Sequence, residues 1–371
     1  MNEGPCVKEG AEIMPDFTFI DKTLGYALKQ KRINIRQFIN LKQKISRMSN
    51  VIFDIPFDFA VRLKGSSGLE LNDVRACIGR NARQVKKAQD LGITRLRISL
   101  ENAACPESYL PWSKVLAEAD VLAEADKLQM KISVGCLDLA GYSTAERAFF
   151  QELVNKSGIE SVVIHDWSSK LDALDTYRRL WELKQVMTCN LEYEGKNFLG
   201  LATGNVLGAV RSGINAVSTS LGGIGDFPAF EEVVMSMSRL LKIPVTVPRD
   251  IAVICKEILE CMGLGIPRTK PVIGSNIFAH ESGIHVDGII KKSELYEPFA
   301  PDEVGLYRKI VIGKHSGRGA IEQKVKELNM SIKPSNVTLL LERARMLAIK
   351  QKAALDDKQL EQLVKEVGGG C

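Results

Sequence analysis

Histidine is scarce in this chain, and cysteine is scattered along it. Only four histidines occur in 371 residues. Eight cysteines are present, but none of them forms a C-x-x-C pair. Zinc sites need cysteine or histidine ligands at characteristic close spacings. The sequence therefore excludes a zinc site of the usual type.

The chain also lacks a long apolar run and a strong excess of one charge. No apolar segment approaches the ~20 residues that span a membrane, and the formal net charge is only +5. Lysine and arginine are spread along the chain, which argues against a nucleic-acid surface. Scattered cysteines without a signal peptide are typical of reduced thiols. We therefore expect a cytoplasmic protein that binds neither a membrane nor nucleic acid.

Short apolar segments recur through residues 17–221, and most are rich in valine and isoleucine, as strands buried on both faces are. Helical patterns separate most of them. This alternation predicts an α/β fold of the TIM-barrel class, a (β/α)8 barrel, over residues 1–245. Residues 246–371 predict a linker and a smaller, mostly helical C-terminal module. The predicted strands are Phe17–Ile20, Val51–Ile55, Ala60–Leu63, Leu96–Leu100, Lys131–Cys136, Ser161–Ile164, Val186–Leu191 and Ala216–Leu221. The predicted helices include Asp73–Leu91, Trp112–Leu128, Thr144–Lys156, Leu171–Leu183, Ala229–Leu241, Ile251–Met262, Ser335–Lys352 and Asp357–Val367.

Chemistry in a parallel barrel lies at the carboxyl ends of its strands. Asp21, Asp166 and Glu194 are the carboxylates at the predicted ends, and Lys196 follows two residues after Glu194. Oxygen ligands of this kind hold Mg²⁺ or Mn²⁺, but the same residues can form internal salt bridges. The residues alone leave both alternatives open.

Three segments carry a more specific signal. They are LATGNVLGAVRSG (201–213), FAHESGIHVDG (278–288) and KHSGRGA (314–320). Together they resemble segments of the homocitrate synthase and isopropylmalate synthase family, most of all the homocitrate synthases of nitrogen fixation. The resemblance implies a barrel that condenses acetyl-CoA with a 2-oxo acid, typically 2-oxoglutarate, with the help of a divalent metal. It also implies dimers in which the C-terminal module reaches over the partner's barrel.

The barrel half departs from the family's pattern at its strand ends. The family's first strand ends in D-T-T-L-R-D-G-E-Q, whose Asp ligates the metal and whose Arg polarises the keto acid. This chain keeps Asp21 but has Gly25 in place of the Arg. The family's H-A-H at the seventh strand becomes Glu194-Gly195-Lys196, and an ammonium offers a metal no lone pair. We therefore expect Lys196 to fill the place of the metal and to pair with Asp21 and Glu194; a metal held by these two carboxylates is the alternative.

The C-terminal module keeps the family's pattern more closely. His280 corresponds to a histidine of the family's acid/base apparatus, and Tyr296 corresponds to a tyrosine that works with it. With the neighbouring Glu281 they are the candidate catalytic residues, and the resemblance implies that they serve an active partner chain. The alternative is that His280 and His285 hold a loop together by hydrogen bonds.

Two hypotheses follow for the whole chain. The first is a homocitrate synthase-like protein that is catalytically silent alone, needs no cofactor and acts as a structural or regulatory partner, in a homodimer or with an intact homologue. The second is an active acyltransferase, or another carbon–carbon-bond enzyme, with a rebuilt site of Asp21, Asp166, Glu194 and Lys196 that uses Mg²⁺ or Mn²⁺ and acetyl-CoA. The candidate substrate-binding residues are Thr203, Asp166 and Lys196.

Overall fold

The computed structural model describes residues 17–63, 70–79, 81–99, 101–102, 105–109, 119–139, 151, 159–281, 288, 292 and 295–368. Contacts divide the chain into two compact units. The first comprises Met1–Val247 with Ile254–Gly265, and the second comprises Pro248–Val253 with Ile266–Cys371. Each unit is described by itself below.

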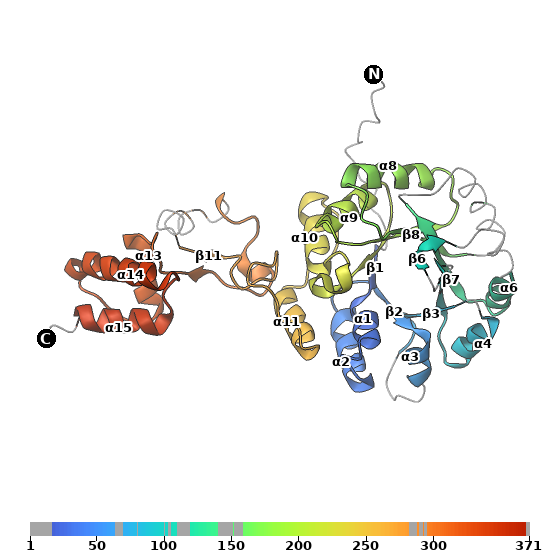
Figure 1. The fold of residues 1–371 in the computed structure, drawn as a ribbon, viewed down its shortest axis with the longest axis horizontal. Coiled ribbons are helices and arrows are strands. Elements are labelled where there is room, and N and C mark those ends of the chain that lie inside the picture. Colours follow the sequence, from blue (N-terminus) through green and yellow to red (C-terminus); the bar gives the residue numbers. More distant parts are fainter. Residues whose placement is uncertain are drawn as a thin grey trace, which may run out of the picture. The chain divides into compact units, whose positions relative to one another are not determined.

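Eight parallel strands of the first unit close into a barrel in the order β1-β10-β9-β8-β7-β4-β3-β2, as the sequence predicts (Figure 1). The burial of β8 explains why such strands are apolar, because all six of its residues are buried and both faces of a parallel barrel strand are covered. The barrel strands are β1 (Thr18–Asp21), β2 (Val51–Pro56), β3 (Val74–Ile78), β4 (Arg95–Ser99), β7 (Lys131–Asp138), β8 (Ser161–Asp166), β9 (Asn190–Gly195) and β10 (Ala216–Thr219). A separate antiparallel pair consists of β5 (Glu101–Asn102) and β6 (Cys105–Tyr109).

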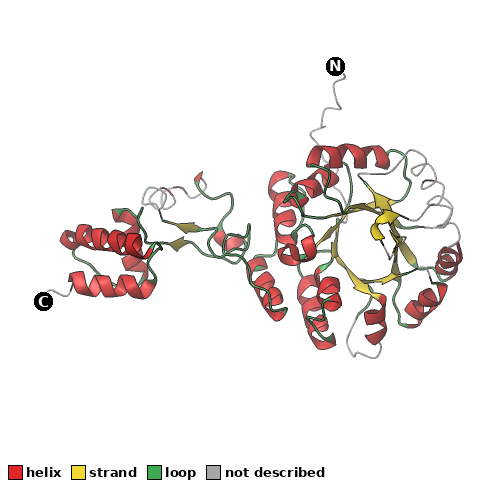
Figure 2. Ribbon diagram, in the orientation of Figure 1, coloured by secondary structure: helices red, strands yellow, loops and turns green. Residues whose placement is uncertain are grey.

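Helices surround the ring of strands (Figure 2). Two of them begin at well-formed caps: Asn34 accepts a hydrogen bond from Gln37 N at 3.0 Å, and Asp172 accepts from Leu174 N and Asp175 N. The helices of the first unit are α1 (Thr23–Lys29), α2 (Ile35–Ser46), α3 (Phe57–Arg62), α4 (Ala82–Asp90), α6 (Ala119–Lys127), α8 (Ala173–Lys184), α9 (Ala202–Arg211), the 3-10 segment η2 (Leu221–Asp226) and α10 (Phe230–Leu240). Helix α11 (Ile251–Cys261) contributes residues to both units.

The predicted third strand is wrong. Ala60–Leu63 lies in and just after helix α3, where Phe57 and Ala60, three residues apart, bury one face. The third strand is Val74–Ile78, inside the segment predicted as the helix Asp73–Leu91. The helix starts only at Ala82, after Asn81 caps it by accepting from Arg83 N. The misassignment arose because a strand and a helix follow each other with almost no loop. Most of the predicted helix Thr144–Lys156 lies outside the described residues.

The second unit is mostly helical, as predicted. Three helices pack around an apolar core that includes Ile321, Leu340 and Val364. A short parallel pair joins β11 (Ala279–His280) to β12 (Lys309–Ile310). The helical segments are η4 (Pro301–Glu303), α13 (Arg318–Glu327), η5 (Pro334–Asn336), α14 (Val337–Gln351) and α15 (Asp357–Gly368). Across the described parts of both units, no helix combines the length and apolarity needed to cross a membrane.

Candidate functional site

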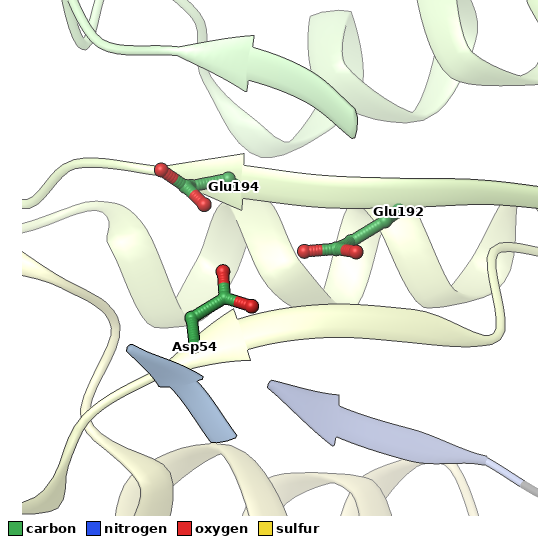
Figure 3. Close-up of side chains that lie close together, drawn as sticks. All are labelled: Asp54, Glu192 and Glu194. Carbon is green, nitrogen blue, oxygen red and sulfur yellow. The ribbon is translucent and has the colours of Figure 1, made fainter. Parts of the chain in front are cut away.

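Six charged side chains, five from four strands and one from the residue after β1, meet inside the barrel, and all six residues are at most 8% exposed. We call them the lumen network. Three are carboxylates, which lie close together on β2 and β9 (Figure 3). Three are cations, so the formal charges balance. The lumen network consists of Asp54, Glu192 and Glu194 with Lys22, Arg75 and Arg97.

Arg75 joins two of the carboxylates. Its Nε and Nη2 donate to Asp54 at 2.5 and 3.0 Å, and its Nη1 and Nη2 donate to Glu192 at 2.7 and 3.0 Å. Nη1 also donates to Ser133 Oγ at 2.9 Å. Such bidentate pairs use the planar fork of the guanidinium and are among the strongest hydrogen bonds in proteins. Arg75 therefore holds the carboxylates of Asp54 and Glu192 in fixed positions.

Lys22 and Arg97 bridge Asp54 and Glu194. The Lys22 Nζ atom lies 2.6 Å from Asp54 Oδ2 and 2.5 Å from Glu194 Oε2. Arg97 Nη1 lies 2.9 and 2.5 Å from the same two oxygens. Ser218 Oγ donates to Glu194 at 3.0 Å. Both carboxylates thus already accept hydrogen bonds from two or more cations.

The electrostatics keep Asp54, Glu194 and Lys22 ionised. Burial alone would raise the pKa of Asp54 and of Glu194, but the neighbouring cations, Arg75 first for Asp54 and Arg97 first for Glu194, hold both pKa values below the usual range. Burial and Arg97 would lower the pKa of Lys22, yet Asp54 and Glu194 raise it. The network is therefore a set of paired buried charges rather than a group of protonated acids.

Ligand atoms of Asp54, Glu192 and Glu194 lie within 4.8 Å of one another, which is close enough to share a metal ion. The cations around them do not fit such an ion, because a divalent metal there would face Lys22, Arg75 and Arg97 at short range. Binding would require at least the Lys22 ammonium to leave both of its partners. Among the described residues this trio includes Glu194 but not Asp21, and the Asp21–Glu194 pair of metal ligands stays a prediction.

The prediction that Lys196 pairs with Asp21 and Glu194 is wrong. Its Nζ donates to Gly225 O at 2.7 Å and lies 3.5 Å from the centre of the Phe227 ring. Glu194 instead pairs with Lys22, which reaches the lumen from the residue after β1. Burial lowers the pKa of Lys196. The cation that takes the central place is therefore Lys22.

Asp21 serves a local role. Its Oδ2 accepts a hydrogen bond from Leu24 N at 2.9 Å and so satisfies a free amide in the first turn of α1. Burial raises the pKa of Asp21 to about 6. The carboxylate that the resemblance assigns to the metal is thus engaged with the backbone.

His165 and the predicted residues Asp166 and Thr203 have protein partners. His165 is buried, with Nδ1 3.7 Å from Glu194 Oε1, and burial lowers its pKa to about 3. Tyr193 Oη donates to Asp166 at 3.5 Å, and Thr203 Oγ1 donates to Glu232 at 2.9 Å. The substrate-binding roles of Asp166, Thr203 and Lys196 stay predictions.

Helix α1 packs tightly at the carboxyl end of the barrel. A Cβ atom on Gly25 would overlap the backbone oxygen of Asp54. A Cβ on Gly225, whose φ is +69°, would lie 2.7 Å from the Tyr26 ring. The position where the family carries its arginine therefore has no room for a side chain unless the backbone shifts.

The candidate catalytic residues of the C-terminal module lie in the second unit. His280 Nε2 is 3.4 Å from Glu297 Oε1, whereas Glu281 Oε1 accepts from His315 N at 2.9 Å. Tyr296 is 40% exposed, and His285 lies outside the described residues. Their catalytic roles stay predictions.

Of the six residues in the lumen network, only Glu194 was among the site residues predicted from the sequence. The other five were missed. A signal was available, because Glu192 and Glu194 are two residues apart on a strand and must face the same side. Charged residues inside strands that are otherwise apolar, such as Arg75 and Arg97, are the same signal.

Two buried groups predict opposite pH effects on stability. The folded state keeps His165 neutral down to about pH 3, so its contribution is present above the ordinary pKa of 6.5 and is lost as the pH falls. The pKa of Asp21 is raised from 3.8 to about 6, so its contribution is present at low pH and is lost as the pH rises through about 6. Between about pH 4 and 6 the two effects on the free energy of unfolding oppose each other.

We expect the substitution Asp21→Asn to expose the His165 effect. The free energy of unfolding should then rise more steeply with pH between about 4 and 6, by up to about 1.4 kcal/mol per pH unit. Urea denaturation at fixed pH values measures this slope. His165→Gln is the matched control and should change the slope in the opposite direction. Equal slopes for the wild type and Asp21→Asn would contradict the conclusion that burial raises the pKa of Asp21.

Comparison with known proteins gives family matches in both units. Residues 72–257 match the HMGL-like family, and residues 272–352 match the family described as homocitrate synthase post-HMGL domain-like. A 2-isopropylmalate synthase 2 of Caldanaerobacter subterraneus subsp. tengcongensis is 36% identical over 222 residues, covering 59% of this chain and 58% of the relative.

Two relatives carry homocitrate synthase names. Homocitrate synthase 1 of Nostoc sp. is 35% identical over 201 residues, covering 53% of each chain. A homocitrate synthase, omega subunit, of Clostridium pasteurianum is 33% identical over 201 residues, covering 53% of this chain and 56% of the relative. The chain thus spans about half the length of these curated relatives.

A solved HMG-CoA lyase of Brucella melitensis has the same fold, with a TM-score of 0.55, 11% identity, and coverage of 67% of this chain and 98% of that chain. The HMGL-like match covers half of the present sequence. This chain therefore belongs to the HMGL-like family.

Proposed function

We propose that this chain is a homocitrate synthase-like protein whose own barrel does not catalyse condensation and that acts as a partner or regulatory chain of an intact homologue. The observation that carries the proposal is the lumen network. Its three carboxylates are neutralised by Lys22, Arg75 and Arg97. Because these carboxylates are already paired with cations of the same chain, no metal is needed to balance their charge.

Displacing Lys22 in favour of a metal is costly. The ammonium makes two short ion pairs in a buried site, and a buried charge that loses its partners costs about 3–5 kcal/mol. A metal would also have to approach two guanidiniums that stay bonded to the same carboxylates. These terms support a metal-free barrel.

The group that would polarise the keto acid in the family reaction is also missing. Gly25 stands where the resemblance places the polarising arginine, and its surroundings leave no room for a side chain. The loss of a single preorganised donor to the developing oxyanion typically lowers kcat by about 10²–10³. Losing both the metal and the guanidinium supports a barrel without measurable condensation.

The C-terminal unit supports the partner role. Residues 272–352 match the post-HMGL domain of homocitrate synthases, so the part outside the barrel keeps its family pattern while the lumen does not. One relative is named as an omega subunit, which denotes one chain of a multichain homocitrate synthase. A silent barrel in such an assembly is consistent with these features.

A second candidate is an active condensing enzyme with a relocated metal. It is favoured by the ligand atoms of Asp54, Glu192 and Glu194, which lie within 4.8 Å of one another. In this case Lys22 would leave the carboxylates when the metal binds. The two candidates differ in whether the wild-type chain binds a divalent ion.

Isothermal titration of the metal-stripped full chain with Mn²⁺, with and without 2-oxoglutarate, tests the silent barrel. We expect no binding in either condition. The variant Lys22→Met removes the ammonium that bridges Asp54 and Glu194 and should gain measurable Mn²⁺ binding. The matched control Lys196→Met removes a cation that bonds to neither carboxylate and should not.

Micromolar binding of Mn²⁺ by the wild type, strengthened by 2-oxoglutarate, would overturn the silent barrel. If Lys22→Met gains no binding although circular dichroism shows it to be folded, Lys22 is not the group that excludes the metal. Lys22→Gln serves in place of Lys22→Met if that variant does not fold.

The partner role predicts a complex with an intact homocitrate synthase chain from the same genome. We expect the two purified chains to elute together in size-exclusion chromatography with light scattering, and the condensation rate of the intact chain to change on mixing. Separate elution with an unchanged rate over a range of concentrations would contradict a partner role.

A further inference from the structure

A buried carboxylate in the second unit is held by two basic side chains. The Glu297 side chain is only 3% exposed. Arg308 Nε donates to both of its oxygens at 3.0 Å, and Arg308 Nη2 donates to Oε2 at 2.7 Å. His280 Nε2 lies 3.4 Å from Oε1. Glu297 therefore links His280 to Arg308.

Glu281, although next to His280 in the chain, belongs to a different set of contacts. Neighbouring residues of an extended strand point to opposite sides. Glu281 Oε1 accepts from His315 N at 2.9 Å, and Glu281 O accepts from Ser316 Oγ at 3.2 Å. Within the described part of the second unit, the carboxylate bonded to His280 is that of Glu297.

This arrangement selects one form of the imidazole. An ionised carboxylate can only accept hydrogen bonds, so the ring nitrogen that faces it must carry the hydrogen. Arg308 donates charge-assisted hydrogen bonds to both oxygens of Glu297, which therefore acts as an acceptor. A neutral His280 ring that donates to this carboxylate would carry its hydrogen on Nε2 and its lone pair on Nδ1.

We propose that Glu297 and Arg308 are positioning residues that hold His280 as a preformed proton acceptor, with Nδ1 available to a hydroxyl or carbonyl compound bound by the barrel of a partner chain. The arrangement parallels the carboxylate that orients a general-base histidine in other enzymes. The His280 side chain is 16% exposed, so part of its ring remains accessible. The partner's barrel rests on the proposed function, whereas the fixed tautomer does not.

Nitrogen NMR of the full chain, labelled with ¹⁵N at its histidines, tests the proposal. The chain has only four histidines, and the variant His280→Gln assigns the signal. We expect the Nε2–H tautomer at His280 in the wild type, and a mixture of tautomers in Glu297→Gln. Glu281→Gln is the matched control and should leave the His280 signal unchanged.

Acylation by diethyl pyrocarbonate, followed by mass spectrometry, tests whether Nδ1 is available. His280 should react, and Glu297→Gln should slow its reaction about tenfold, by analogy with the loss of the hydrogen-bonded carboxylate that raises the basicity of a metal-bound histidine. The exposed His315 is the internal reference.

The Nδ1–H tautomer in the wild type would overturn the proposal, even if Glu297→Gln does not fold. So would a His280 that resists acylation in the folded wild type, or a folded Glu297→Gln variant with the wild-type tautomer. Both measurements use this chain without metal or partner. A failure of the silent-barrel proposal in the Mn²⁺ titration is therefore distinguishable from a failure here.

Discussion

The pairing of buried charges inside the barrel is the constraint on which the first unit depends. Asp54, Glu192 and Glu194 are almost fully enclosed, and isolated buried carboxylates are too costly to keep ionised. Arg75 compensates two of them with bidentate bonds, while Lys22 bridges Asp54 and Glu194. Because each cation serves two carboxylates, removing any one of them leaves at least two charges short of a partner.

This constraint connects the fold to the proposed function. The carboxyl ends of barrel strands bring polar groups together whatever chemistry they serve. A metal and a bound substrate can balance these groups from outside, or side chains of the same chain can do so. Here Lys22 and Arg97 do so at Glu194, and helix α1 fits against β2 only because residue 25 is glycine. In the second unit, by contrast, a single buried carboxylate, that of Glu297, is shared by Arg308 and His280.

Much of the fold could be predicted because strands buried on both faces leave a clear apolar signal. One exception, β3, contains Arg75 and is followed almost at once by α4, so its charge and short loop hid it in a helical pattern. Another is the predicted strand Val186–Leu191, which shares only its last two residues with β9. The candidate site was harder to predict. Lys196 was the expected central cation, but whether Lys22 or Lys196 turns inward depends on the loop that carries Gly225 and Phe227. Sequence spacing does not fix that choice, whereas the alternation of Glu192 and Glu194 does fix their shared face.

The most direct test is an anomalous difference map from crystals of the wild-type chain soaked in Mn²⁺. A lumen that neutralises itself predicts no manganese peak among Asp54, Glu192 and Glu194, with the Lys22 ammonium still bonded to Asp54 and Glu194. A manganese peak coordinated by these carboxylates, with Lys22 displaced, would contradict the proposal that side chains of this chain have taken the place of the metal.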